Sequence, residues 1–357
     1  MIKRNFKKIL KANRLLLYGI GNQFKECYKL LKEKDLFLFD GNSDKWGEMI
    51  EGRRIMSPSQ MKNYITSGTV ILITSIKNQY EIAKYLVEDL HIPVQNIFMY
   101  TSAWYEDKIY KLEMIERNWN RILACAEKLA DEESKRYYMH SIMARRQRNP
   151  LLLEPNSNAI MVGEYGDRVR LEKGESIIDC GAYTGDTAEL YVKRLEGNCV
   201  VYAIEPYREN YDKMLVRIAE NGYRDKIQPY NCAVSNMVKD TIINYSKSDF
   251  GMAINLSNDQ GEEKQIVAVE TLDDLLGDKK VSYIKMDIEG EEKAALEGAR
   301  KIISEQHPKL LISGYHKIED FWEIPETVWS INRNYKIYVG HAPGVSTEVE
   351  FYCIDTK

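Results

Sequence analysis

The chain has 357 residues, of which 44% are hydrophobic and 29% are charged, values typical of a globular protein long enough for more than one domain. Its formal net charge of −4 argues against a general nucleic-acid-binding protein, whose binding domain is normally basic. The six cysteines are scattered without a Cys-x-x-Cys pair, which predicts reduced thiols in a cytoplasmic protein and neither a disulfide framework nor a zinc site. No run approaches the ~18 apolar residues that span a bilayer, so we expect no stable membrane insertion.

Residues 1–103 are predicted to form a small Rossmann-like domain. A basic stretch at the N-terminus is expected to form a helix, and strand-like runs then alternate with helix-like stretches. This alternation indicates βαβ units and a parallel sheet. The expected strands are 15–18, 36–39, 70–74 and 97–100, and the expected helices are 23–34, 58–66 and 79–90.

A glycine turn follows the first expected strand, in LLLYGIGNQFKE. Gly19 and Gly21 occupy the first two positions of a dinucleotide fingerprint, but Phe24 stands where the third glycine belongs. Without that glycine, close helix–strand packing at a pyrophosphate site is in doubt. Asp40 ends the second expected strand, where a ribose-binding acid would lie. The turn therefore predicts either a nucleotide site that uses Gly19, Gly21 and Asp40, or a scaffold sheet without a ligand.

Residues 104–172 are expected to connect two sheets. The part from 104 to 148 contains no Gly or Pro and many charges among apolar residues, which predicts two or three helices. The part that follows has the Pro, Asn and Gly content of a loop.

Residues 173–357 are predicted to form a second α/β domain with a seven-stranded sheet. Five strands should be parallel, and the last two are expected to form an antiparallel hairpin at the sheet edge. The stretch 246–255 could line a substrate pocket or form a turn between two short β segments. The expected strands are 176–180, 200–204, 227–233, 283–286, 309–313, 335–339 and 349–354, and the expected helices are 187–194, 208–220 and 291–305.

A second glycine turn, IIDCGAYTGDTAEL, follows the first strand of this domain. Acidic residues bracket its glycines, so the turn would repel a pyrophosphate but suits a cationic ligand. S-adenosylmethionine carries a sulfonium and an ammonium group, and it is the predicted cofactor. Glu205 ends the next strand, where an acid can accept hydrogen bonds from ribose hydroxyls. The predicted cofactor-binding residues are Asp179, Gly181, Ala182, Tyr183, Thr184, Gly185, Asp186, Thr187, Glu205, Pro206 and Ala233.

Three further polar residues follow the strands 283–286 and 309–313. Asp287 and Glu289 follow the first of these strands, and His316 follows the second; ligands of open α/β sheets bind at such carboxyl ends. A histidine with a pKa near neutral is a sensible general base, and Asp287 could orient it, take the proton itself or bind a metal. The structural alternatives are a helix cap for Asp287 and an ordinary hydrogen-bonded histidine for His316. We predict that Asp287, His316 and Glu289 are catalytic and that no metal is bound, because no dense acidic cluster is evident.

Several motifs of this half together resemble the FkbM family of S-adenosylmethionine-dependent methyltransferases. They are IIDCGAYTGDT, YAIEPYRENYDKM, VETLDDLL, YIKMDIEGEEKAALEGA and LLISGYHKIEDFWEIPETV. The resemblance extends from about residue 129 to the C-terminus and implies a class I methyltransferase fold and O-methylation, often in bacterial glycan or natural-product pathways. The stretch from Asp40 through KWGEMIEGRRIMSP is similar to Rossmann-like domains of bacterial sugar-modifying acyltransferases and nucleotide-sugar enzymes, which implies a nucleotide- or nucleotide-sugar-binding module.

The predicted function is therefore S-adenosylmethionine-dependent O-methylation of a sugar, glycan or related natural product by in-line methyl transfer. The alternative is a non-catalytic protein that binds a nucleotide or nucleotide sugar through its N-terminal module. A nicotinamide-dependent oxidoreductase is disfavoured by Phe24 and by the lack of a suitably placed Tyr-x-x-x-Lys. The expected partner is a small-molecule or glycan acceptor and not a nucleic acid, and a homo-oligomer is compatible with the sequence.

Overall fold

A computed structural model of the chain describes residues 9, 11–75, 77–100, 110–155, 164–248, 251–255, 263–342 and 345–356. Most of the predicted N-terminal basic helix lies outside these described residues. The chain divides into two compact units, each assembled from three segments. The first unit comprises Met1–Asn120, Arg136–Asn156 and His341–Thr347, and the second comprises Arg121–Lys135, Ser157–Gly340 and Glu348–Lys357.

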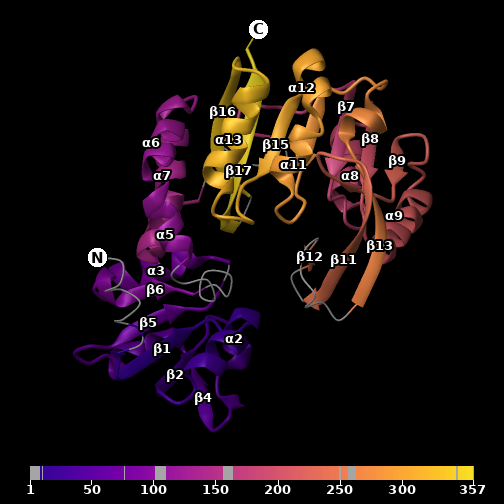
Figure 1. Cartoon of the computed structure of the whole chain (residues 1–357). Coiled ribbons are helices and arrows are strands. Elements are labelled where there is room, and N and C mark those ends of the chain that lie inside the picture. Colours follow the sequence, from indigo (N-terminus) through magenta and orange to yellow (C-terminus); the bar gives the residue numbers. More distant parts are fainter. Residues whose placement is uncertain are drawn as a thin grey trace. The chain divides into compact units, whose positions relative to one another are not determined.

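The first unit contains a six-stranded sheet with the strand order β3-β4-β2-β1-β5-β6 (Figure 1). All neighbouring strands are parallel except β3, which runs antiparallel to β4. The four predicted strands are present, whereas β3 and β4 are too short to show a hydrophobic period in the sequence. The strands are β1 (Arg14–Tyr18), β2 (Asp35–Phe39), β3 (Met49–Ile50), β4 (Arg53–Met56), β5 (Val70–Ile73) and β6 (Ile97–Met99).

Both faces of this sheet are buried, which explains the uninterrupted apolar run of β1. Successive strand side chains point to opposite faces. Leu15 and Leu17 therefore pack in one core with α2, and Leu16 and Tyr18 pack in a second core with α3. The helices of this sheet are α2 (Asn22–Leu31) and α3 (Gln79–Glu88), with 3₁₀ helices at Ser43–Lys45, Pro58–Tyr64 and Val94–Asn96; the predicted helix 58–66 is thus a 3₁₀ helix.

Three helices follow in the predicted connector: α5 (Tyr110–Arg117), α6 (Trp119–Lys128) and α7 (Glu132–Gln147). The end of α7 belongs to the first unit, because Met99 in β6 packs with Ala144 and Leu153 and its amide donates to Arg148 O. Arg121–Lys135, which includes most of α6, belongs to the second unit. The stretch 104–172 is therefore divided between the two units. The predicted boundaries at 103 and 172 stay a prediction.

The second unit contains a seven-stranded sheet with the order β16-β17-β15-β14-β7-β8-β9. The strands from β15 to β9 are parallel, and β17 runs antiparallel to β15 with Leu310 opposite Cys353. Only two residues join β16 to β17, so these strands form the predicted antiparallel hairpin. The strands are β7 (Glu175–Cys180), β8 (Cys199–Ile204), β9 (Ile227–Tyr230), β14 (Tyr283–Met286), β15 (Lys309–Ser313), β16 (Tyr335–Ala342) and β17 (Val345–Asp355).

The helices of the second unit depart from prediction at three places. The predicted helix 291–305 is interrupted at Gly298, where a Cβ atom would lie 2.0 Å from Ser235 O. Two helices were not predicted: α10 (Leu272–Leu276), which has only five residues, and a longer helix with Pro325 inside it, which forms because Trp322 and Ile324 are buried in the core. The helices are α8 (Asp186–Arg194), α9 (Arg208–Glu220), α11 (Glu292–Glu297), α12 (Arg300–Gln306) and α13 (Asp320–Ile331).

A separate four-stranded sheet, with the order β10-β13-β11-β12, is inserted between β9 and β14. The predicted strand 227–233 is therefore wrong at its end: β9 stops at Tyr230, and Ala233 begins β10 in the second sheet. The stretch 246–255 contributes to β11 and β12, with Ser248 opposite Gly251. Residues 249 and 250 lie outside the described residues. The elements are β10 (Ala233–Val234), β11 (Lys239–Ser248), β12 (Gly251–Asn255), β13 (Glu263–Glu270) and α10 (Leu272–Leu276).

Among the described helices, none is both long enough and apolar enough to cross a membrane.

Candidate active site

The second glycine turn connects β7 to α8 at the carboxyl edge of the seven-stranded sheet. Gly181 and Gly185 have φ angles of +77° and +80°, which L side chains rarely adopt. A Cβ atom on Gly181 would lie 1.9 Å from Asp287 O, and one on Gly185 would lie 2.8 Å from Met214 Cγ. The turn thus needs glycine at both positions, and it lies directly beside the end of β14.

Glu205 is buried at the end of β8 and binds the turn. Its Oε2 accepts from Tyr183 N at 2.9 Å, and its Oε1 accepts from Tyr207 N at 2.9 Å. Burial raises the pKa of Glu205 to about 7, although these amides and Asn210 oppose the rise. Each oxygen of a carboxylate has two lone pairs, so Glu205 can hold the turn and still accept from a ligand.

Asp179 lies beneath the turn and not on its surface. Its carboxylate is fully buried, and Oδ1 lies 3.0 Å from Lys285 Nζ. Lys285 also donates to Gly181 O at 3.0 Å. Burial lowers the pKa of Lys285, but the nearby Asp179 and Asp287 outweigh it and the pKa is raised. Asp179 therefore supports the turn through Lys285. We had not predicted a role for Lys285, although a lysine inside a buried strand is a sequence feature that could have indicated one.

The remaining predicted cofactor residues fall into two groups. Tyr183, Thr184, Asp186 and Thr187 are at least partly accessible on the turn and the first turn of α8. The other three are not accessible residues of the turn: Ala182 and Pro206 are buried, and Ala233 begins β10. Tyr183 combines a positive φ of 49° with a side chain that is 48% exposed, a strained conformation of the kind that clusters at functional sites.

Asp287, Glu289 and His316 lie together, as predicted. His316 Nε2 is 3.5 Å from Asp287 Oδ1 and 3.8 Å from Glu289 Oε2. Two residues that the sequence did not indicate complete the cluster. Tyr315 Oη donates to Asp287 Oδ1 at 3.1 Å, and His316 Nδ1 lies 2.9 Å from Glu292 Oε1.

The charges around His316 change its expected role. Burial lowers the pKa of His316, but Glu292, Asp287 and Glu289 outweigh burial and raise this pKa to about 9. At neutral pH the imidazole is therefore protonated. This corrects the expectation of a near-neutral histidine base, because a protonated ring cannot accept a proton. The Asp287 carboxylate is the better-placed proton acceptor.

The other histidines that could compete for this role have different surroundings. His341 contacts Ser141 Oγ at 2.8 Å, and its burial lowers its pKa to about 3. His307 Nδ1 lies 2.8 Å from Asp355 Oδ2. His307 does not contact Asp287 within the described part of the chain.

The same cluster offers donor atoms of the kind that bind divalent cations. Asp287, Glu292 and His316 each place one donor atom within 4.8 Å of the others. Glu292 is fully buried, and its Oε2 has no hydrogen-bond partner among the described residues. Glu289 is not among these three donor residues. The expectation that no metal is bound stays a prediction.

The first glycine turn has a different arrangement. Ile20 N donates to Asp40 Oδ2 at 2.6 Å, and Asn42 N donates to Oδ1 at 2.8 Å. Lys45 Nζ also lies 3.1 Å from Asp40 Oδ2. Gly19 has a φ of +103°, and a Cβ atom there would lie 2.9 Å from Ser75 N, so the turn needs glycine at this position. The amide that would face a phosphate instead binds the predicted ribose acid, an arrangement that is unfavourable for a dinucleotide; at Gly21 the space is open.

The strand order of the second unit is that of the class I methyltransferase fold, and the candidate site lies at the carboxyl edge of its sheet. Residues 179–337 match the family model described as "Methyltransferase FkbM domain". Residues 11–98 match a second model, described as "C2185-like, N-terminal". No curated protein matches the chain.

One solved structure supports the fold along almost the whole chain. The chain is similar to the crystal structure of Methyltransferase FkbM from Methylobacillus flagellatus KT, with 22% identity, a TM-score of 0.69 and coverage of 98% of this chain and 93% of that one. A putative rRNA-methylase from Clostridium thermocellum has 9% identity and a TM-score of 0.33, with 52% and 88% covered. Fibrillarin from Aeropyrum pernix in complex with S-adenosylmethionine has 12% identity and a TM-score of 0.34, with 52% and 68% covered. Similarity as low as that of the last two does not establish a function for this chain.

Proposed function

We propose that the protein transfers the methyl group of S-adenosylmethionine to a hydroxyl oxygen of a sugar, glycan or related natural product. The observation that carries this proposal is the direct contact between the cofactor turn and Asp287. A Cβ atom on Gly181 would lie 1.9 Å from Asp287 O, so a ligand on the turn and a proton acceptor on β14 share one edge of the sheet. Such proximity is the main requirement of an in-line transfer between two bound reactants.

The residues of the turn fit this cofactor. Glu205 is buried and keeps lone pairs for the ribose hydroxyls, and Asp186 and Asp287 favour a cationic ligand by their charge. When bound, S-adenosylmethionine supplies an electrophilic methyl group on its sulfonium.

Asp287 is the proposed acceptor of the hydroxyl proton. A hydroxyl is a weak nucleophile at neutral pH and needs a positioned base. Tyr315 Oη and His316 Nε2 both lie near Asp287 Oδ1, at 3.1 and 3.5 Å. These neighbours hold the carboxylate in one orientation, and the imidazolium stabilises its negative charge. His316 is thus a positioning residue for Asp287.

The proposal of a sugar acceptor is supported by the aromatic residues next to these groups and by the family resemblance. Tyr183 is 48% exposed on the cofactor turn, and Tyr315 lies beside Asp287. Aromatic side chains with a polar end suit carbohydrate rings, which have both apolar faces and hydroxyl groups.

Calorimetric titration with S-adenosylmethionine and with its demethylated product tests the cofactor. We expect the unmodified protein to bind both and Gly185→Arg to bind neither, since the new side chain would displace Met214 and fill the turn. Gly222→Arg is the matched control, because Gly222 also has a positive φ of 71° but no atom within 4 Å of a Cβ position. Binding of NAD(H) in place of S-adenosylmethionine would refute the proposal.

Transfer from S-adenosylmethionine with a labelled methyl group tests the acceptor. Incubation with a panel of sugars and glycans, followed by mass spectrometry of the product, should locate the label on oxygen. Label on nitrogen or carbon would refute the O-methylation part and leave the cofactor assignment intact.

A further inference from the structure

A pocket of about 530 Å³ lies in the first unit and is not part of either glycine turn. Ile55 and Met56 of β4 line it, followed by Ser57 directly after the strand. Trp46, which lies beyond the end of β2, lines it as well. Open α/β sheets bind ligands at the carboxyl ends of their parallel strands, and β2 and β4 are a parallel pair. The volume is also within the range of small-molecule sites.

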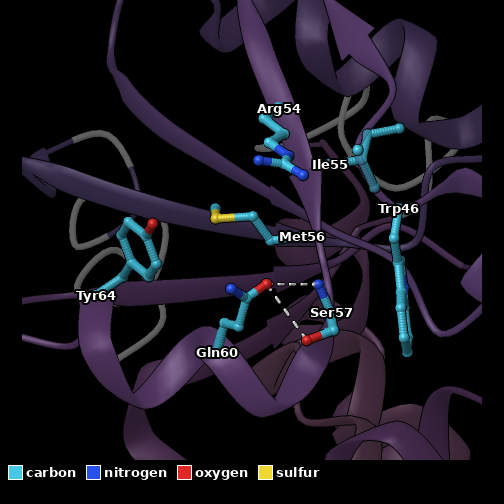
Figure 2. A pocket seen from close by; sticks show the side chains of 8 residues that line it. Trp46, Arg54, Ile55, Met56, Ser57, Gln60 and Tyr64 are labelled. Atoms are coloured by element: carbon cyan, nitrogen blue, oxygen red, sulfur yellow. Dashed lines mark hydrogen bonds between the residues drawn. The ribbon is translucent and has the colours of Figure 1, made fainter.

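Trp46 gives this pocket an exposed aromatic wall. Its indole Nε1 donates to Asp40 O at 2.7 Å, which fixes the orientation of the ring. The residue nevertheless remains 45% exposed. An exposed but immobilised indole is a stacking surface for a sugar or a base, since little conformational entropy is lost when a ligand covers it. In the view of Figure 2, Trp46 and Tyr64 lie on opposite sides of the pocket.

Arg54 supplies the only charge among the described residues that line the pocket, which include no Asp or Glu. Its side chain reaches over Gly47, with Nη2 3.5 Å from a Cβ position there. Within the described part of the chain, the side chain of Arg54 has no hydrogen bond or ion pair. The neighbouring Arg53, by contrast, donates to Tyr28 Oη and Lys32 O. A guanidinium without an acidic partner binds phosphate well, because its donors match two phosphate oxygens.

Gln60 adds a second group of donors. Its Oε1 accepts from Ser57 N and from Ser57 Oγ (dashed lines in Figure 2). These bonds occupy the carbonyl end of the amide and leave the NH₂ end available for a ligand. The polar groups of the pocket are therefore mainly donors, which favours a ligand rich in acceptor oxygens.

We propose that this pocket binds an organic phosphate, with the phosphate on Arg54 and a ring stacked on Trp46. Two sources share this chemistry: a nucleoside diphosphate, which stacks its base, and a sugar phosphate, which stacks its sugar ring. The site is separate from the proposed methyl-transfer site, and its residues all belong to the first unit.

Calorimetry on the full-length protein tests the proposal with uridine diphosphate, glucose 1-phosphate and inorganic phosphate as probes. We expect at least one organic phosphate to bind, and to bind at least about tenfold more tightly than inorganic phosphate, because stacking adds to the charge interaction. Heat from uridine diphosphate alone would identify a base site, and heat from glucose 1-phosphate would identify a sugar site. No binding of either, or equal binding of inorganic phosphate, would overturn the proposal.

Substitutions at two residues that line the pocket test whether the organic phosphate binds there. Arg54→Gln and Trp46→Leu should each weaken binding by about tenfold or more, whereas Trp46→Phe should retain most of it. Arg117→Gln is the control for loss of an exposed arginine, since among the described residues the Arg117 side chain pairs only with Glu113, and both are exposed. Circular dichroism checks that each variant is folded.

Gly185→Arg separates this proposal from the proposed function. Binding of the organic phosphate should persist in that variant even though S-adenosylmethionine binding is lost. Loss of both in Gly185→Arg, or unchanged binding in Arg54→Gln and Trp46→Leu, would place the organic phosphate elsewhere and refute the pocket.

Discussion

Glu205 combines two properties that make cofactor binding sensitive to pH. Its carboxylate is buried, with a pKa raised to about 7, and the ribose hydroxyls would donate to its ionised form. Binding should therefore be strongest above the raised pKa and weaken as the pH falls through 7. We expect S-adenosylmethionine to bind roughly tenfold more weakly at pH 6 than at pH 8, as measured by calorimetry.

Glu205→Gln is the control for this dependence. It keeps two polar atoms at the same place but does not titrate, so its affinity should be lower and nearly independent of pH over the same range. A flat profile in the unmodified protein would show that Glu205 does not face the cofactor in its ionised form.

The proposed role of Asp287 as proton acceptor can be tested with a single substitution. Replacement by Asn removes the proposed base but preserves the size of the side chain. We expect Asp287→Asn to lower turnover by about 10²- to 10⁴-fold and to change cofactor affinity by no more than a few-fold. Glu291→Gln is the control, because Glu291 follows the same loop and, among the described residues, its side chain forms only an ion pair with Lys317 at 3.7 Å. Full activity in Asp287→Asn would contradict the assignment.

At the scale of elements, β17, which lies between β16 and β15, introduces a buried acid into the large sheet. Glu350 is 6% exposed, and burial raises its pKa to about 7 even though a hydrogen bond from Tyr352 opposes the rise. An acid whose pKa is raised in the folded state contributes stability below its ordinary pKa of about 4.5 and loses that contribution as the pH rises through 7. The loss above pH 7 is on the order of 3 kcal/mol.

Glu350→Gln should therefore raise the melting temperature at pH 8 relative to the unmodified protein, with little difference at pH 5. Differential scanning calorimetry at the two pH values measures this effect. Glu305→Gln removes an exposed acid from α12 and should leave the melting temperature unchanged at both. An equal effect of Glu350→Gln at pH 5 and pH 8 would exclude titration as its cause.

The elements also show what the sequence can and cannot reveal. The strand β14 and the residues Asp287 and His316 were predictable, because the carboxyl ends of neighbouring parallel strands meet at one edge of a sheet. The contacts of Glu292 and Lys285 were not, because they depend on side-chain directions that the spacing of residues does not determine. The inserted sheet from β10 to β13 was also missed: its strands pair mainly with one another, and no turn signal separates β9 from β10.

At the scale of the whole molecule, each of the two units is built from three segments of the chain. We nevertheless expect each unit to unfold cooperatively and separately from the other. We expect two transitions in calorimetry. S-adenosylmethionine should raise only the transition of the second unit, and an organic phosphate only that of the first, by several degrees at about 100 times the Kd. A single transition that both ligands raise equally would mean that the two units unfold together.

The bond between Asp40 and the first glycine turn makes the carboxylate an internal counter-anion. Ile20 N, Asn42 N and Lys45 Nζ all converge on it, as they would on a bound phosphate. The Asp40 carboxylate thus occupies the anion site that these donors form. Asp40→Ala should empty that site and lower the melting temperature. Small anions such as acetate or phosphate should then raise the melting temperature of the variant as their concentration rises. The unmodified protein should not show this chemical rescue.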